Sequence, residues 1–191
     1  MTHEEFYGED YQKLLQAEQL LKDLIQRFQD NESEKKIAYI SSRIKSPDSM
    51  IKKLEKKKIE PTAENALLKV NDAVGIRVIC SFVDDIYKVS KWLGDQEEIE
   101  IIKIKDYIAY PKENGYRSYH MIIKIKALNL NAEIQIRTIA LDFWANLEHQ
   151  MKYKKHIRNE EMIRSELKRC ADEIASVDLS MQTIKDLIFM E

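Results

Sequence analysis

Residues 118–138, SYHMIIKIKALNLNAEIQIRT, alternate between apolar and polar side chains in two segments that a short interval separates. A period of two is typical of strands that bury one face, so the pattern predicts strands over residues 118–127 and 132–138. The interval between them is short enough for an antiparallel hairpin. We therefore expect a β-sheet in the middle of the chain, with this hairpin in it.

The same alternation assigns the polar side chains of the hairpin to faces. His120 and Lys124 share one side of the first strand, while Glu133, Gln135 and Arg137 share one side of the second. Pairing of the strands could place His120 and Lys124 beside Glu133. A solvent-facing antiparallel sheet shows the same polar pattern, so the patch alone does not distinguish a functional site from plain surface.

Elements on either side of the hairpin complete the predicted fold. Further strands are expected over residues 73–83 and 98–105, and helices over residues 4–29, 47–57, 84–93, 139–153 and 163–187. This order indicates an α+β fold, in which a mixed sheet of about five strands is flanked by helices, with long helices at both ends. We expect a single domain, with an N-terminal helix in residues 1–30, a core in residues 40–155 and a C-terminal helix in residues 159–189.

The composition indicates a soluble globular protein. Of 191 residues, 44% are hydrophobic and 34% charged, and 31 basic against 33 acidic residues argue against a surface coated in positive charge for general nucleic-acid binding. Cys80 and Cys170 form neither a disulfide framework nor a zinc spacing, so we expect buried free thiols. No apolar run could span a bilayer and the N-terminus is acidic, so we expect a cytoplasmic protein.

The segment KDYIAYPKENGYRSYH, residues 105–120, combines cations, aromatic rings and a glycine in a way that suits a nucleotide. Its candidate phosphate ligands are Lys105, Lys112, Arg117 and His120, and its tyrosines, including Tyr116, offer ring faces for a base. Gly115 would let the backbone approach a ligand closely. The alternative is a surface turn, because proline, asparagine and glycine are ordinary turn residues.

A second cationic segment, RIKSPDSMIKKLEKK, precedes and forms the predicted helix 47–57, in which Ser46 can cap and Pro47 can occupy the first turn. Ser49, Lys52, Lys53 and Lys56 recur at helical spacing, and Arg43 and Lys45 precede the helix N-terminus, where negative charge is also favoured. A polyphosphate would fit there. A lysine-rich solvated face is the alternative.

Two carboxylates suggest a magnesium site. Asp72 opens the predicted strand in the sequence DAVGIR, and Glu133 projects from the hairpin. Mg²⁺ prefers oxygen ligands and is usually held by one or two carboxylates together with substrate phosphates. Asp72 could also be an ordinary turn residue leading into a strand.

The helix expected over residues 139–153 divides into two faces at about 100° per residue. The apolar face is formed by Phe143, Trp144, Leu147 and Met151, and the other by Asp142, Ala145, Glu148, His149 and Lys152. The polar face follows the Glu133 strand closely, so we expect it to join the candidate site. Taken alone, it would be an ordinary exposed face, and His149 would be a structural histidine.

Four glycines are too few for a P-loop or a kinase glycine-rich loop, and no nucleophile elbow is present. A carboxylate pair, a cationic helix and an aromatic platform remain, and together they fit transfer of a phosphate group between nucleotides.

Several ordered motifs resemble those of the RelA/SpoT synthetase family. They are R-x-K at residues 43–45 with Ser49 and Lys53 following, D-x-x-G-x-R at 72–77, KDYI with PKENGYRSYH at 105–120, and EIQIRT followed by DFWANLEH at 133–149. The chain looks like a stand-alone small alarmone synthetase with a nucleotidyltransferase-like fold. The resemblance implies a GTP diphosphokinase of the stringent response, which transfers the β,γ-pyrophosphate of ATP to the ribose 3′-hydroxyl of GDP or GTP and releases AMP.

The resemblance also implies roles for individual residues. On the ATP side, the adenine would lie between Arg43 and Arg77, and the ATP phosphates would be held by Lys45, Ser49 and Lys53. Mg²⁺ would be bound by Asp72 and Glu133. On the acceptor side, guanine would stack on Tyr116 near Asp142 and Glu148, and the acceptor phosphates would contact Lys105, Lys112 and His120. Glu133 would also act as the base for the 3′-hydroxyl. Flat guanidinium groups are suited to stacking on a base.

Partners and alternatives follow from the same resemblance. It suggests a homotetramer formed through the terminal helices. Such an assembly is compatible with allosteric activation by an alarmone. The alternatives are an adenine nucleotide or the tRNA 3′ end as acceptor, a catalytically idle nucleotide- or RNA-binding module, and a helical scaffold. RNA binding in addition to catalysis stays open.

Overall fold

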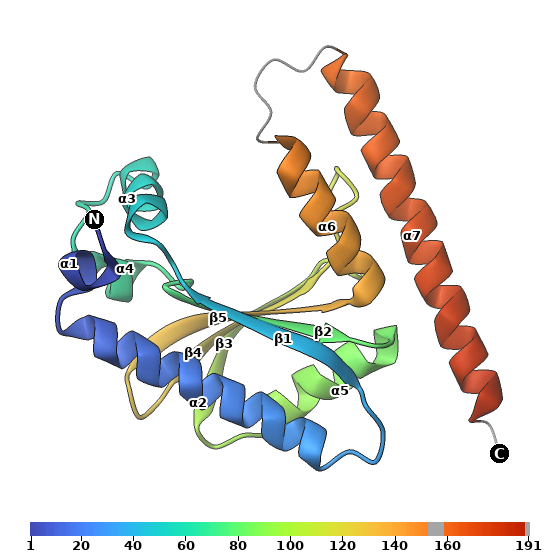
Figure 1. Ribbon diagram of the computed structural model, residues 1–191, viewed down its shortest axis with the longest axis horizontal. Helices are drawn as coiled ribbons and strands as arrows, with labels where there is room; N and C mark the ends of the chain where they lie inside the picture. Colours follow the sequence, from blue (N-terminus) through green and yellow to red (C-terminus); the bar gives the residue numbers. More distant parts are fainter. Residues whose placement is uncertain (153–158, 190–191) are drawn as a thin grey trace.

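The computed structural model describes residues 1–152 and 159–189 as one α+β unit (Figure 1). The five strands are β1 (Ile37–Ile44), β2 (Val74–Cys80), β3 (Ile99–Asp106), β4 (Tyr119–Ile125) and β5 (Leu130–Thr138). They form one sheet in the order β1-β2-β5-β4-β3, in which β2 and β5 are parallel and the other neighbours antiparallel. The predicted mixed sheet and the β4–β5 hairpin are confirmed.

The helices are α1 (His3–Tyr7), α2 (Asp10–Asp30), α3 (Pro47–Lys56), α4 (Ala63–Lys69), α5 (Val83–Gly94), α6 (Ile139–Lys152) and α7 (Glu160–Ile188). The sequence predicted one helix over 4–29, and this was wrong at Gly8, where a φ of 56° ends α1 before α2 begins. The helix α4 was not predicted; the Thr62 hydroxyl caps it by accepting from the Asn65 N–H.

The hydrophobic core lies between the sheet and the helices α2 and α5, which cover one face of it (Figure 1). From α2, the fully buried side chains include Leu14, Leu21 and Ile25. From β5, Ile134 and Ile136 point into the core, as the alternation predicted. The opposite, polar face of the sheet lies between α3 and α6, and the candidate site is on that face.

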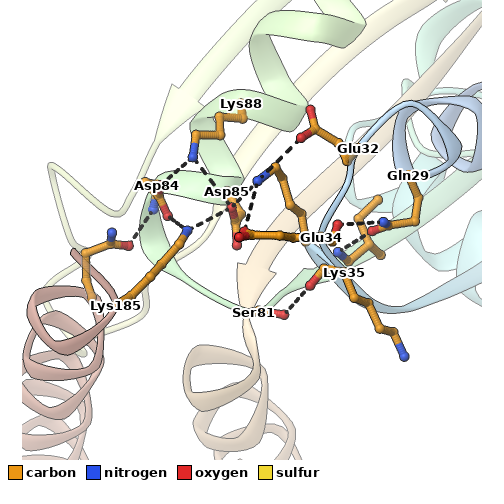
Figure 2. A network of polar contacts seen from close by, with 12 residues as sticks. Gln29, Glu32, Glu34, Lys35, Ser81, Asp84, Asp85, Lys88 and Lys185 are labelled. Carbon is orange, nitrogen blue, oxygen red and sulfur yellow. Dashed lines mark hydrogen bonds and ion pairs between the residues drawn. The ribbon is translucent and has the colours of Figure 1, made fainter. Parts of the chain in front are cut away.

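Ion pairs fix the C-terminal part of α7 to the start of α5 (Figure 2). The Lys185 Nζ lies 2.8 Å from the Asp84 Oδ1 and 3.2 Å from the Asp85 Oδ1. Lys36, before β1, approaches Asp85 as well. Lys185 and Asp85 are both buried, and burial of either charge without the other would be strongly unfavourable. The helix α7 is therefore anchored on the domain.

Other expectations can be compared with the structure. Cys80 is buried as expected, Cys170 is only partly buried, and both thiols are free. None of the helices in residues 1–152 and 159–189 has the length and hydropathy needed to cross a membrane. Tyr153, at the end of the helix predicted over 139–153, lies outside the described residues.

Candidate active site

The polar face of the sheet gathers predicted site residues in two rows across the strands. In the first row, Gly75 on β2 pairs with Arg43 on β1 and with Glu133 on β5. The second row consists, in strand order, of Ser41, Arg77, Gln135, His120 and Lys105. Directly paired residues point to the same side of a sheet. The rows therefore bring the two arginines of the predicted ATP site, Glu133, and two residues of the predicted acceptor site to one face.

Asp72 lies just before β2 and is held by two lysines. The Asp72 Oδ2 accepts from the Lys45 Nζ at 3.0 Å and from the Lys53 Nζ at 2.6 Å. Burial pushes the pKa of Asp72 up, but the hydrogen bonds and charges of Lys53 and Lys45 outweigh burial and hold this pKa below its usual range. Asp72 is therefore a carboxylate at neutral pH, with the two predicted phosphate-binding lysines beside it.

Glu133 is held from two sides. The Glu133 Oε1 lies 3.2 Å from the His120 Nδ1, and the Gln135 Nε2 donates to the Glu133 Oε2 at 3.1 Å. Burial raises the pKa of Glu133, but the hydrogen bonds to His120 and Gln135 outweigh burial, and the net pKa is lowered although the nearby Asp72 charge opposes this. Glu133 is therefore ionised at neutral pH and can accept a proton.

The donor set of Asp72 and Glu133 fits a magnesium ion. The Asp72 Oδ1 is buried, and among the described residues it has no hydrogen-bond partner, which is costly unless a ligand satisfies it. No three or more His, Cys, Asp or Glu side chains of the described residues are grouped to hold a metal. Two carboxylates would leave most of the coordination sphere to substrate phosphates and water, as Mg²⁺ commonly requires.

Tyr116 lies at the end of the loop between β3 and β4, with cations over its ring. The Lys112 Nζ is 4.7 Å from the centroid of the Tyr116 ring, and the guanidinium carbon of Arg137 is 5.2 Å from it. The Tyr116 hydroxyl accepts from the Arg137 Nη2 at 2.6 Å and lies 2.9 Å from the His120 Nε2. A base that stacks on Tyr116 would therefore compete with the Lys112 ammonium group for the face of this ring. Both ring nitrogens of His120 contact protein groups here, so its predicted contact with phosphate would need one of these contacts to open.

Asp142, on α6, is the centre of a buried polar cluster. Its Oδ1 accepts from the Arg137 Nη1 at 2.9 Å, and its Oδ2 accepts from the Tyr39 hydroxyl at 2.7 Å. The Arg77 Nη1 is 3.4 Å from the same Oδ1. The sequence reasoning did not assign roles to Tyr39 and Arg137. A role for Arg137 could have been predicted, because strand alternation places its side chain on the same face as that of Glu133.

The expectation for the two faces of α6 was half right. From the predicted polar face, Asp142, Ala145 and Glu148 are buried, and the Asn114 Nδ2 donates to the Glu148 Oε1 at 3.1 Å. Phe143 and Leu147, assigned to the apolar face, are 59% and 40% exposed. Trp144 of the same predicted face is buried, however, and His149 of the predicted polar face is exposed, so side chains of both predicted faces point inward.

Residues of the predicted ATP side lie at the end of β1 and the start of α3. Ser46 is at the N-cap position of α3, but its hydroxyl pairs with the Ser49 hydroxyl at 2.9 Å and does not cap the backbone as expected. Arg43 and Ser49 are exposed, and Lys53 lies inward beside Asp72. Lys52 and Lys56 are exposed on α3, as the solvated-face alternative predicted for them.

A cavity of about 1390 Å³ opens beside Tyr116. Lys112, Tyr116 and Glu148 line it from the loop and from α6, and Leu167 and Lys168 line it from α7. Three residues of the predicted acceptor site thus share one cavity, and among the described residues the C-terminal helix also lines it.

Comparisons with known proteins agree with one another. The model of the region found in RelA / SpoT proteins matches residues 42–158. The GTP pyrophosphokinase YwaC of Bacillus subtilis (strain 168) is 43% identical over 155 residues, which cover 78% of this chain and 74% of YwaC. The structure of the small alarmone synthetase 1 from Bacillus subtilis bound to its product pppGpp has a TM-score of 0.80 and 29% identity, covering 97% of both chains. The same synthetase bound to AMPCPP gives a TM-score of 0.73 and 26% identity, covering 98% of both chains.

Proposed function

Because the chain belongs to the RelA/SpoT family and is a GTP pyrophosphokinase of the small alarmone synthetase kind, we propose that its reaction takes place on the polar face of the sheet. In this reaction, the 3′-oxygen of GDP or GTP forms a bond to the β-phosphorus of ATP. The bond between that phosphorus and the oxygen bridging to the α-phosphate breaks, and AMP leaves with the bridging oxygen. The products are ppGpp or pppGpp and AMP.

The ATP side of the proposed site is formed by β1, α3 and the start of β2. Lys45 and Lys53 carry the charge that polyphosphate needs, and Ser49 adds a hydroxyl at the start of α3. Arg43 and Arg77 share the sheet face, one strand apart, and would hold adenine between them. The homologous structure with AMPCPP supports an ATP-type ligand for the family.

The acceptor side is formed by the loop before β4, by β3 to β5 and by α6. Tyr116 would stack on guanine, with Asp142 and Glu148 near the edge of the base, and Lys105 and Lys112 would bind the acceptor phosphates. His120 would join them or hold Glu133, which it contacts here.

The single observation that carries the chemistry is the position of Glu133, which His120 and Gln135 hold near Asp72 and its two lysines. A ribose hydroxyl is a poor nucleophile at neutral pH, so Glu133 would take its proton while the lysines neutralise the charge that develops on the leaving phosphate. Asp72 and Glu133 would hold Mg²⁺, which would supply further charge neutralisation. Most of the acceleration would come from alignment and electrostatics.

The proposed assembly is a homotetramer formed through α7, in a cytoplasmic enzyme whose substrates are cytoplasmic nucleotides. An apolar stripe on α7, made of Val177, Met181, Ile184 and Ile188, is exposed at a spacing of four, three and four residues. The helix α2 buries its apolar face in the core of its own chain, so it supplies less of such an interface than the sequence suggested. Light scattering that gives a monomer at micromolar concentration would contradict the tetramer.

One assay tests the proposed reaction. The protein is incubated with Mg²⁺, ATP and, in separate reactions, GMP, GDP or GTP, and the products are separated by ion-exchange chromatography. The proposal predicts AMP in equal amount to a guanine nucleotide with two additional phosphates. ADP formed in place of AMP would show an ordinary kinase and refute the proposal.

A further inference from the structure

Arg117 points away from the predicted phosphate side and binds α7. Its Nη2 donates to the Asp172 Oδ1 at 3.0 Å. Its Nη1 lies within hydrogen-bond distance of two carbonyls, at 3.2 Å from the Gly115 O and 3.4 Å from the Ala171 O. The guanidinium therefore joins the acceptor loop to the middle of α7. It was expected among the phosphate ligands, and its position excludes that role in this arrangement.

The loop between β3 and β4 packs against α7 at two small residues, Gly115 and Ala171. Gly115 has a φ of +86°, and a Cβ placed on it would lie 2.6 Å from the Ala171 Cβ. Ala171 is buried. Any larger side chain at either position would push the loop away from the helix. The loop and α7 are therefore closely packed at this point, and the hydrogen bonds of Arg117 lie beside this contact.

Tyr116, next in sequence, packs on the same part of α7. It lies against the small apolar cluster of Trp144, Ala145 and Ala171, and the Trp144 indole donates to the Leu167 O at 2.9 Å. On its other side, the Tyr116 hydroxyl is bonded to Arg137 and His120. The ring that would stack on guanine is thus supported by the sheet through its hydroxyl, and by the cluster that α6 and α7 form through its packing.

The helix α7 can serve as this support because it is held elsewhere. Lys185 pairs with Asp84 and Asp85 of α5 (Figure 2), and Asp178 accepts from the Thr138 hydroxyl at the start of α6. The ATP-side groups Lys45 and Lys53 contact Asp72 and lie on other elements.

We propose that Arg117 is a positioning residue, which uses α7 to hold Tyr116 in the orientation that the acceptor base requires. The proposal rests on the proposed role of Tyr116 in acceptor binding. It makes acceptor affinity depend on α7, a helix that carries none of the motif residues named above, while ATP affinity does not depend on it.

Three variants and a control test the proposal in the full chain. Arg117→Gln removes the link, Asp172→Ala removes one partner at an exposed position, and Arg117→Lys retains the charge but not the fork of donors. Arg169→Gln is the matched control, because Arg169 also pairs with two carboxylates of α7, Glu166 and Glu173, but faces solvent. The measurements are KM for GDP and for ATP, the Kd of GDP alone by calorimetry, and the melting temperature.

Misplacing a stacking platform costs roughly tenfold in acceptor affinity, so Arg117→Gln is expected to raise both the KM and the Kd for GDP by about that factor. The ATP KM should stay within about twofold, Asp172→Ala and Arg117→Lys should show smaller rises in the same parameters, and Arg169→Gln should show none. Unchanged GDP parameters in Arg117→Gln would overturn the proposal. Equal rises for GDP and ATP with a lowered melting temperature would also overturn it, because they would show general destabilisation. The proposed function is tested separately, by whether the wild-type protein forms AMP and the pyrophosphorylated guanine nucleotide, and does not depend on the KM and Kd values of the variants.

Discussion

Two substitutions at Gly75 separate stability from activity, because alanine is expected to stabilise the fold and leucine to weaken ATP binding. It lies in the first row of the polar face, between Arg43 and Glu133, where a side chain would project into the proposed ATP site. A Cβ there would meet only the Arg43 Cγ and the Arg43 O, both at 3.9 Å, which is ordinary contact, and its φ is not positive. The backbone therefore accepts alanine without strain.

The two effects can be estimated separately. Glycine loses more backbone freedom on folding than alanine, so Gly75→Ala should stabilise the fold by roughly 0.5–1 kcal/mol. For a chain of this size, that gain raises the melting temperature by about 1–4 °C. Gly75→Leu places four carbons over the space between Arg43 and Glu133, and we expect a rise in the ATP KM of roughly tenfold or more, because adenine and phosphates are misplaced.

Thermal unfolding followed by circular dichroism and steady-state kinetics with varied ATP test this reasoning. Gly94→Ala is the control, since Gly94 ends α5 on the opposite side of the sheet and its added Cβ would meet only the end of the Ile101 side chain. An ATP KM for Gly75→Leu equal to that of the wild type would refute the placement of ATP over this row. A loss of stability in Gly75→Ala would refute the estimate of space at Gly75.

Three further predictions follow. Asp72→Asn and Glu133→Gln should each lose nearly all turnover while the proteins stay folded by circular dichroism, and a near-normal rate in either would contradict its role. Tyr116→Ala should weaken GDP binding by about 1–3 kcal/mol with little change for ATP, which calorimetry would measure, and an unchanged GDP Kd would argue against stacking. Because the folded pKa of Asp72 lies below its ordinary 3.8, its stabilisation is complete above that value and is lost as the pH falls through the lowered pKa. The difference in unfolding free energy between wild type and Asp72→Asn should therefore shrink below about pH 4, and a difference that grows on acidification would contradict the sign.

The hairpin and its polar face could be predicted from the sequence because strand alternation is a local property. Once β4 and β5 pair with a short turn, His120 must lie near Glu133, and the two are in contact. The strand β1 was not predicted, because IAYISSRI carries Ser41 and Arg43 on the face that turns to the site, and Ser42 on the other face. The polar second half of this segment is typical of a loop, and its strand conformation depends on pairing with β2.

The errors at α6 and Arg117 have a common physical cause. Helical periodicity identifies the two faces of α6, but it does not show that Asp142 pairs with Arg137, which lies five residues earlier in β5. Arg117 lies among phosphate-binding candidates in sequence, yet Asp172 of α7, distant in sequence, determines its direction. Neither pairing follows from the periodicity of a single element, and the Arg117–Asp172 pair joins segments 55 residues apart.

The central claim is that two phosphates move together from ATP to a ribose hydroxyl. ATP labelled at the β-phosphate with ³²P, incubated with the protein, Mg²⁺ and GDP, tests it most directly. The account predicts that the label appears in ppGpp, that α-labelled ATP leaves its label in AMP, and that Glu133→Gln abolishes the formation of both products. Label from the β-phosphate recovered in ADP, with γ-label alone transferred to the guanine nucleotide, would contradict the account.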